Sequence, residues 1–281
     1  MTMKLTVLID NHTLIDHYFQ GEPGLSYHLQ EGHHSILFDT GYSDAFIRNA
    51  SKLGIDLLQL DTIVLSHGHS DHTWGLLPLL ALYNEAVKEK RPHTRPRLIA
   101  HPDVFCPKIS DPGVEYGVLV EKDKIERCFN LQLSQQPVSI TDKLFFLGEI
   151  DRRLPFEGKK TMGRVYSNGQ WTPDSMVDDS AIAFRGAQGV TVITGCSHSG
   201  ICNITEQAKR VCKQETIANI IGGLHLLKPD SVQLEGTLAY LKTLKLPRLH
   251  ACHCTDLASK VALSAIVPVE EMGVGARFEF E

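Results

Sequence analysis

The sequence has no apolar run approaching the roughly 18 residues that a membrane-spanning helix needs. Its first apolar stretch, residues 4–9, is short and is soon interrupted by Asp10, which does not suit a secretory signal peptide. This stretch instead predicts an opening β-strand. We therefore expect a cytoplasmic protein with no membrane partner.

Patterned cysteines and excess positive charge are also missing. The seven cysteines are an odd number without repeated spacing, so no disulfide framework is indicated and reduced thiols are expected. The formal net charge of −5 offers no general nucleic-acid-binding surface. No phosphate-cradling P-loop is seen, and nothing in the sequence indicates the oligomeric state. These absences favour a small-molecule substrate.

What the sequence does contain is a dense group of metal-ligand side chains. Residues 66–76 read SHGHSDHTWGL, with three histidines and one aspartate in the spacing H-x-H-x-D-H. A short apolar, β-branched run at 61–66 precedes this group and predicts a buried strand. Apolar residues at helical spacing follow it over 74–90 and predict a helix. The four ligand-type side chains should therefore lie on a strand-to-helix turn.

The spacing within this turn suggests two metal positions. His67 and His69 are two residues apart in an extended turn, so both can face one ion. Asp71 and His72 open the helix and can project toward a second ion. Neutral imidazole and carboxylate suit Zn²⁺, Fe or Mn²⁺. We expect zinc, as two ions, with iron or manganese as the alternatives.

Three later histidines follow β-rich runs in the same way. His198, His225 and His253 each end such a run and precede or open a helix. This repeated placement should bring them to the end of the sheets where the first cluster lies. His198 and His253 are predicted metal ligands. His225 is either a further ligand or a hydrogen-bond donor to the substrate.

These motifs resemble a known family. The H-x-H-x-D-H turn and the FDTG sequence at 38–41 resemble signatures of the metallo-β-lactamase superfamily. GCSHSG at 195–200, GGLH at 222–225 and HCT at 253–255 are similar to its dihydropteroate synthase-like branch. That branch is named after enzymes that make a dihydropterin linked to ribofuranosyl-aminobenzene phosphate.

Element order and the resemblance point to the same fold class. Strands dominate the first part of the chain, and strands alternate with helices in the later part, which suits two face-to-face sheets with helices outside. The resemblance likewise implies an α+β, four-layer αββα sandwich. We predict one domain over residues 1–281, with an irregular insertion at 151–178 that covers the site. A solvated surface loop is the alternative for this insertion.

The insertion offers candidates for substrate binding. Arg152 and Arg164 could pair with an anionic group, and Trp171 could stack on a flat ring. The insertion ends beside Asp178 and Asp179, which are candidate acidic ligands.

The resemblance also exposes a departure from the family pattern. The superfamily usually joins its two metals through an aspartate that follows a glycine, and this place reads Gly195-Cys196 here. Cys196, His198 or the pair Asp178 and Asp179 could replace that aspartate. A thiolate in this position would favour zinc.

The predicted function follows from such a centre. Two metals about 3.5–4 Å apart would hold a hydroxide and polarise a substrate. Asp71 would orient the hydroxide, and His225 would serve the leaving group as a protonated side chain. We predict a metal-dependent hydrolase that uses a metal-bound hydroxide on a small anionic phosphoester, ester, lactone or amide. The alternatives are a synthase acting on a pterin and a phosphorylated aminobenzene riboside, an iron-dependent redox enzyme, and a non-catalytic binding protein.

Overall fold

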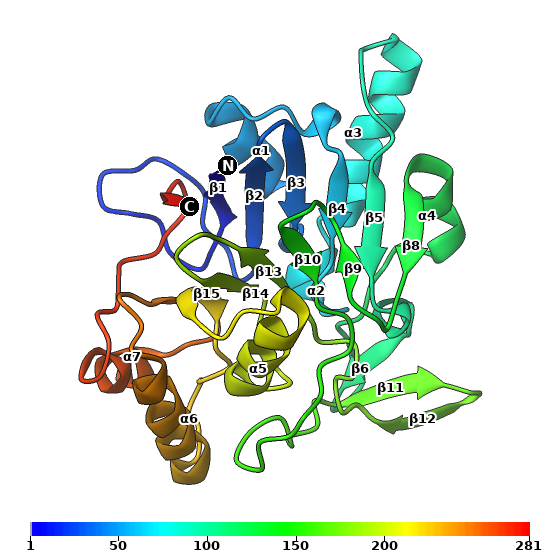
Figure 1. The fold of residues 1–281 in the computed structure, drawn as a ribbon. Helices are drawn as coiled ribbons and strands as arrows, with labels where there is room; N and C mark the ends of the chain where they lie inside the picture. The colour runs from blue at the N-terminus through cyan, green and yellow to red at the C-terminus, as the bar shows by residue number, and fades with distance from the viewer. Residues whose placement is uncertain (1) are drawn as a thin grey trace.

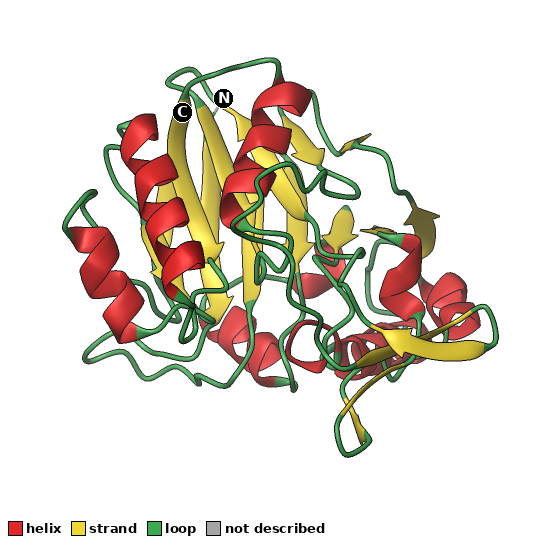
Figure 2. Cartoon of the chain, turned by 90° about the horizontal axis from the view of Figure 1, so that it is seen from below, coloured by secondary structure: helices red, strands yellow, loops and turns green. Residues whose placement is uncertain are grey.

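Two β-sheets lie face to face in the computed structural model, which describes residues 2–281, and helices cover both outer faces (Figures 1 and 2). The predicted four-layer αββα sandwich is confirmed. The strands predicted over 4–9 and 61–66 and the helix predicted over 74–90 are present as β1 (Met3–Ile9), β4 (Thr62–Val64) and α3 (Leu76–Glu89). No helix among the described residues is long and apolar enough to cross a membrane.

The first sheet has seven strands in the order β17-β1-β2-β3-β4-β5-β8. Their bounds are Arg277–Phe280 for β17, Met3–Ile9 for β1, Ser26–Glu31 for β2, His34–Phe38 for β3, Thr62–Val64 for β4, Arg97–Ala100 for β5 and Asn130–Leu133 for β8. Strands β3, β4, β5 and β8 are parallel neighbours. The helices packed on this sheet are α1 (Ala45–Lys52), α3 (Leu76–Glu89) and α4 (Lys122–Cys128).

The second sheet has six strands in the order β16-β15-β14-β13-β10-β9. Their bounds are His250–Cys252 for β16, Ile217–Gly223 for β15, Val190–Thr194 for β14, Ala181–Arg185 for β13, Leu144–Phe146 for β10 and Val138–Ser139 for β9. Strands β14, β15 and β16 run parallel, so their carboxyl ends meet at one edge. The outer helices are α5 (Ile201–Cys212), α6 (Ser231–Leu244) and α7 (Leu257–Ser264).

Three apolar clusters hold the four layers together. In β4, Ile63 packs toward the first set of helices, whereas the next residue, Val64, packs toward the second sheet. This alternation follows from the two-residue period of a strand. Phe184 is fully buried between the sheets, and burial of such a side chain stabilises the fold by roughly 1.5–3 kcal/mol.

A third sheet is a finding that the sequence prediction missed. It has the order β12-β11-β6-β7 and lies at one side of the molecule in Figure 1. Its bounds are Gln170–Pro173 for β12, Arg164–Ser167 for β11, Lys108–Ser110 for β6 and Val114–Glu115 for β7. The expectation that 151–178 lacks regular structure is therefore wrong for 164–173. Asn168 and Gly169 form the hairpin turn with φ of 51° and 81°, as a two-residue Asn-Gly turn requires.

Candidate metal centre

The predicted site residues meet where strands of both main sheets end. The H-x-H-x-D-H turn follows β4 and continues into the short helix α2 (Ser70–Thr73). His198, His225 and His253 follow β14, β15 and β16. The shared direction of these three parallel strands explains why residues far apart in sequence converge here.

The turns that carry these side chains approach one another closely. A Cβ atom on Gly195 would lie 2.2 Å from Ser66 Oγ, so only glycine allows this approach. Asp39, His225 and His253 have φ of 57°, 51° and 52°, in the left-handed region. Non-glycine residues adopt this conformation infrequently, and here the packing of the turns holds three site residues in it.

The first group of ligand-type atoms comes from His67, Cys196 and His198. One ligand atom from each of these residues lies within 4.8 Å of the others. The His69 ring adjoins this group, at 4.6 Å from the ring centre of His67 and 4.7 Å from that of His198. The Nε2 atoms of all three histidines are buried and have no hydrogen-bond partner among the described residues. Such unpartnered nitrogens are what a metal ion would use.

The protonation states of these histidines suit metal binding. Burial lowers the pKa of His69 to about 3 and lowers the pKa values of His67 and His198 well below their usual range. Each ring is therefore neutral near pH 7 and has a nitrogen lone pair to donate. The first group thus presents neutral imidazoles, the form that ligates zinc.

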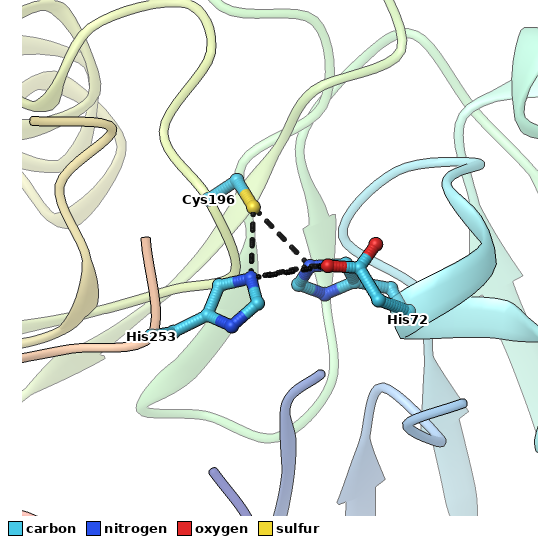
Figure 3. A group of neighbouring side chains, drawn as sticks. His72, Cys196 and His253 are labelled. Carbon is cyan, nitrogen blue, oxygen red and sulfur yellow. Dashed lines mark hydrogen bonds and ion pairs between the residues drawn. The ribbon is translucent and has the colours of Figure 1, made fainter. Parts of the chain in front are cut away.

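The second group comprises Asp71, His72, Cys196 and His253. Figure 3 labels His72, Cys196 and His253. The Cys196 Sγ lies 3.2 Å from Nε2 of both His72 and His253, and these two nitrogens are 3.2 Å apart. Asp71 Oδ2 lies 3.7 Å and 3.4 Å from the same nitrogens. Ligands of a tetrahedral zinc ion, at about 2.0–2.3 Å from it, lie about 3.3–3.8 Å from one another. The spacing of the four atoms therefore fits one zinc ion.

Neighbouring oxygen atoms orient three of the histidines. Nδ1 of His72 lies 2.7 Å from Asp39 Oδ2, and Nδ1 of His253 lies 3.1 Å from Asn11 Oδ1. Both oxygens are acceptors, so each Nδ1 carries the proton and each Nε2 is free for a metal. Nδ1 of His67 lies 2.9 Å from the Ser66 hydroxyl, which itself donates to Asp39. The same tautomer follows for His67.

The carboxylates of Asp71 and Asp39 also favour positive charge at the second group. Burial alone would lower the pKa of His72, but Asp71 and Asp39 outweigh it and raise that pKa to about 9. Without a metal, a proton on His72 Nε2 therefore balances this negative charge near pH 7, and a bound metal ion would take the place of that proton.

Cys196 belongs to both groups, whereas two other candidates for the bridging position do not. Asp178 Oδ2 accepts the Gly68 amide at 2.8 Å, and Oδ1 pairs with Lys108 at 3.0 Å. Asp179 accepts from the backbone amide and hydroxyl of Ser199. Each aspartate therefore binds a backbone amide through one oxygen, and neither belongs to the two groups.

A cavity of about 600 Å³ opens beside the two groups. Its lining includes His69, Asp71, His198, His225 and His253, so the candidate catalytic residues face one space.

The structure does not bring the three predicted substrate-binding residues to this cavity. Arg152 donates hydrogen bonds to the carbonyls of Gly158 and Met176. These bonds hold the loop of residues 152–158 in place. Arg164 and Trp171 lie on the β11–β12 hairpin, where Trp171 packs against Tyr166. From this part of the chain, Met162 lines the cavity instead.

Comparisons with known proteins agree with this fold. The profile of the metallo-β-lactamase superfamily matches residues 20–133, which include the H-x-H-x-D-H turn. A metal-dependent hydrolase of the β-lactamase superfamily, known from a crystal structure, is 27% identical and aligns over 98% of both chains with a TM-score of 0.82. The chain is therefore similar to the metallo-β-lactamase superfamily, in sequence over residues 20–133 and in fold over nearly its whole length.

The chain is also similar to proteins with other names. A curated relative from Methanocaldococcus jannaschii is named 7,8-dihydropterin-6-methyl-4-(β-D-ribofuranosyl)-aminobenzene-5'-phosphate synthase. It is 28% identical over 273 residues, which cover 92% of this chain and 89% of the relative. A diphosphatase from the PhnP family is 16% identical, with a TM-score of 0.53 over 100% of this chain and 98% of the other. The second likeness shows the shared fold alone.

Proposed function

We propose that this protein is a member of the metallo-β-lactamase superfamily and a metal-dependent hydrolase with two metal positions that share the Cys196 thiolate. The observation that carries the proposal is the presence of Cys196 in both ligand groups beside the cavity. His67, His69 and His198 would complete one position, and Asp71, His72 and His253 the other. Ions bound there would lower the pKa of a water molecule and polarise the bond to be cleaved.

The protein's own residues orient the reactants in this proposal. The Asp71 carboxylate lines the cavity, and its Oδ2 faces the His72 and His253 nitrogens. It can therefore accept a hydrogen bond from the attacking water and fix its direction. Asp39 and Asn11 hold the histidine rings in place, so little reorganisation is needed during the reaction.

His225 takes the hydrogen-bonding role rather than the acid role. Burial, with a contribution from Lys160, lowers the pKa of His225 to about 4, so the ring is neutral near pH 7. A neutral imidazole can still donate one N–H to a substrate oxygen. Its ring lies 4.2 Å from that of His198, which places this donor beside the first group.

Removal of the metal should abolish turnover if this proposal is correct. We expect a purified sample to hydrolyse at least one class among phosphodiesters, phosphomonoesters, lactones and esters. Activity should disappear after dialysis against a chelator and return on addition of Zn²⁺ or Mn²⁺. Hydrolysis that persists at full rate in the chelated protein would contradict the proposal.

The curated relative favours a second candidate, a synthase acting on a pterin and a phosphorylated aminobenzene riboside. Its sequence aligns with 92% of this chain. The same samples, supplied with a reduced pterin and such a riboside, distinguish the two functions. Formation of a coupled product without hydrolysis of any class would replace the hydrolase by the synthase.

A further inference from the structure

A second, smaller cavity of about 260 Å³ lies next to the metal cavity. The two cavities meet at His198 and His225, which line both. The rest of the side cavity is formed by residues 155–160 and by the first turn of α6. A substrate that reacts at the metal centre could therefore extend past these two histidines.

The side cavity contains an unused polar group at its inner end. His198 is 8% exposed, and neither of its ring nitrogens has a partner among the described residues. A metal ion can use one of these nitrogens. The second ring nitrogen of His198 would still lack a partner, whereas Nδ1 of His72 and Nδ1 of His253 each have a protein oxygen as partner. A ligand in the side cavity would supply the missing partner.

Two lysines give the outer part of the cavity its positive charge. Lys160 Nζ lies 3.3 Å from both Asp230 Oδ2 and Gln233 Oε1. Lys159 is exposed and forms no ion pair with any residue of 2–281. One positive charge is therefore left without an acidic partner.

The acidic residues around the cavity do not cancel this charge. The Glu157 carboxylate accepts from the backbone amides of Asn203 and Cys202 at the start of α5, so it is turned to that helix. Asp230 accepts the Gln233 amide at the start of α6 and pairs with Lys160.

We propose that the side cavity binds the anionic end of the substrate, a phosphate or carboxylate group, through Lys159, Lys160 and the free nitrogen of His198. This inference rests on the proposed hydrolase only in naming the occupant as part of a substrate. Residues 155–160 lie near the start of the insertion predicted at 151–178. In this proposal they select substrates that carry a negative charge. Arg152, by closing this loop, shapes the cavity without contacting the ligand.

Calorimetric titration with inorganic phosphate tests the proposal in the metal-loaded protein. We expect phosphate to bind, and Lys159→Ala and Lys160→Ala each to raise its Kd by about tenfold, as for loss of one charge-assisted hydrogen bond. Metal content should not change. Lys242→Ala is the matched control, because Lys242 is exposed near the far end of α6 and should leave the Kd unaltered.

Three outcomes would decide against the side cavity. An equal Kd in all variants would place phosphate elsewhere, and loss of binding on chelation would place it on the metals. No binding at millimolar phosphate would also overturn the proposal. Because calorimetry needs no turnover, lysine-dependent binding in a protein that hydrolyses nothing would overturn the hydrolase and leave the subsite intact.

Discussion

His69→Ala and His253→Ala should each remove about one metal ion per chain, as expected for two separate ligand groups. His69 adjoins the first group, and His253 belongs only to the second. Hydrolysis should fall by about 1,000-fold in either variant, because the metals contribute several kcal/mol to transition-state stabilisation. Elemental analysis of the purified variants, beside their rates, measures both effects.

Two comparisons make this result specific. His33→Ala removes an exposed histidine from the β2–β3 turn and should retain both ions and full activity. Far-UV circular dichroism establishes that each variant is folded. If either site variant keeps the full metal content, that histidine is not a ligand.

Lys108→Met should destabilise the fold by about 3–5 kcal/mol, because it leaves buried carboxylates without a counter-charge. Lys108 is 1% exposed, and its Nζ lies 2.6 Å from Asp174 Oδ2 and 3.0 Å from Asp178 Oδ1. Burial would lower the lysine pKa, but Asp178 and Asp174 raise it above its usual range. These two ion pairs also support the H-x-H-x-D-H turn, since Asp178 accepts a hydrogen bond from the Gly68 amide. Urea unfolding measures the loss.

The destabilisation should depend on burial and on unpaired charge. Lys124→Met removes an exposed ion pair with Glu121, 2.9 Å long, and should cost about 1 kcal/mol or less. Adding Asp174→Asn and Asp178→Asn to Lys108→Met removes the uncompensated charges while keeping amide oxygens as acceptors. This triple variant should recover part of the stability. Equal losses for Lys108→Met and Lys124→Met would refute the interpretation.

The local parts of the site could be predicted from sequence because they depend on short spacings. The H-x-H-x-D-H motif follows an apolar run and precedes a helical one, which determines where the turn lies. The structure places His67 beside His69 and puts Asp71 and His72 together in the other group. The later histidines could be found because each follows a β-rich run.

The partners that support the site could not be predicted in this way. Lys108 is 66 and 70 residues from its two aspartates, and Asn11 is 242 residues from His253. No local sequence pattern indicates contacts between residues so far apart in the chain. Asp178 and Asp179 are candidate ligands in the sequence because a loop returns there, but they lie outside the two ligand groups and each accepts a backbone amide.

The third sheet was missed for a different reason. Strands β6 and β7 have three and two residues, too few to show a two-residue period. The β11–β12 hairpin did carry a usable signal, the Asn168-Gly169 pair between β-rich residues. The substrate-binding roles expected for Arg164 and Trp171 depended on treating this hairpin as an irregular loop.

Metal ligation by the Cys196 thiolate is central to the proposed function. The X-ray absorption spectrum of the bound metal tests this ligation most directly. With zinc bound, we expect a sulfur neighbour at about 2.3 Å beside the nitrogen and oxygen neighbours. That sulfur signal should be absent from Cys196→Ala, while Cys254→Ala, which changes the adjacent cavity thiol, should retain it. Ligation by Cys196 would be contradicted if the spectrum of the unaltered protein showed nitrogen and oxygen neighbours alone. It would also be contradicted if the sulfur signal survived in Cys196→Ala.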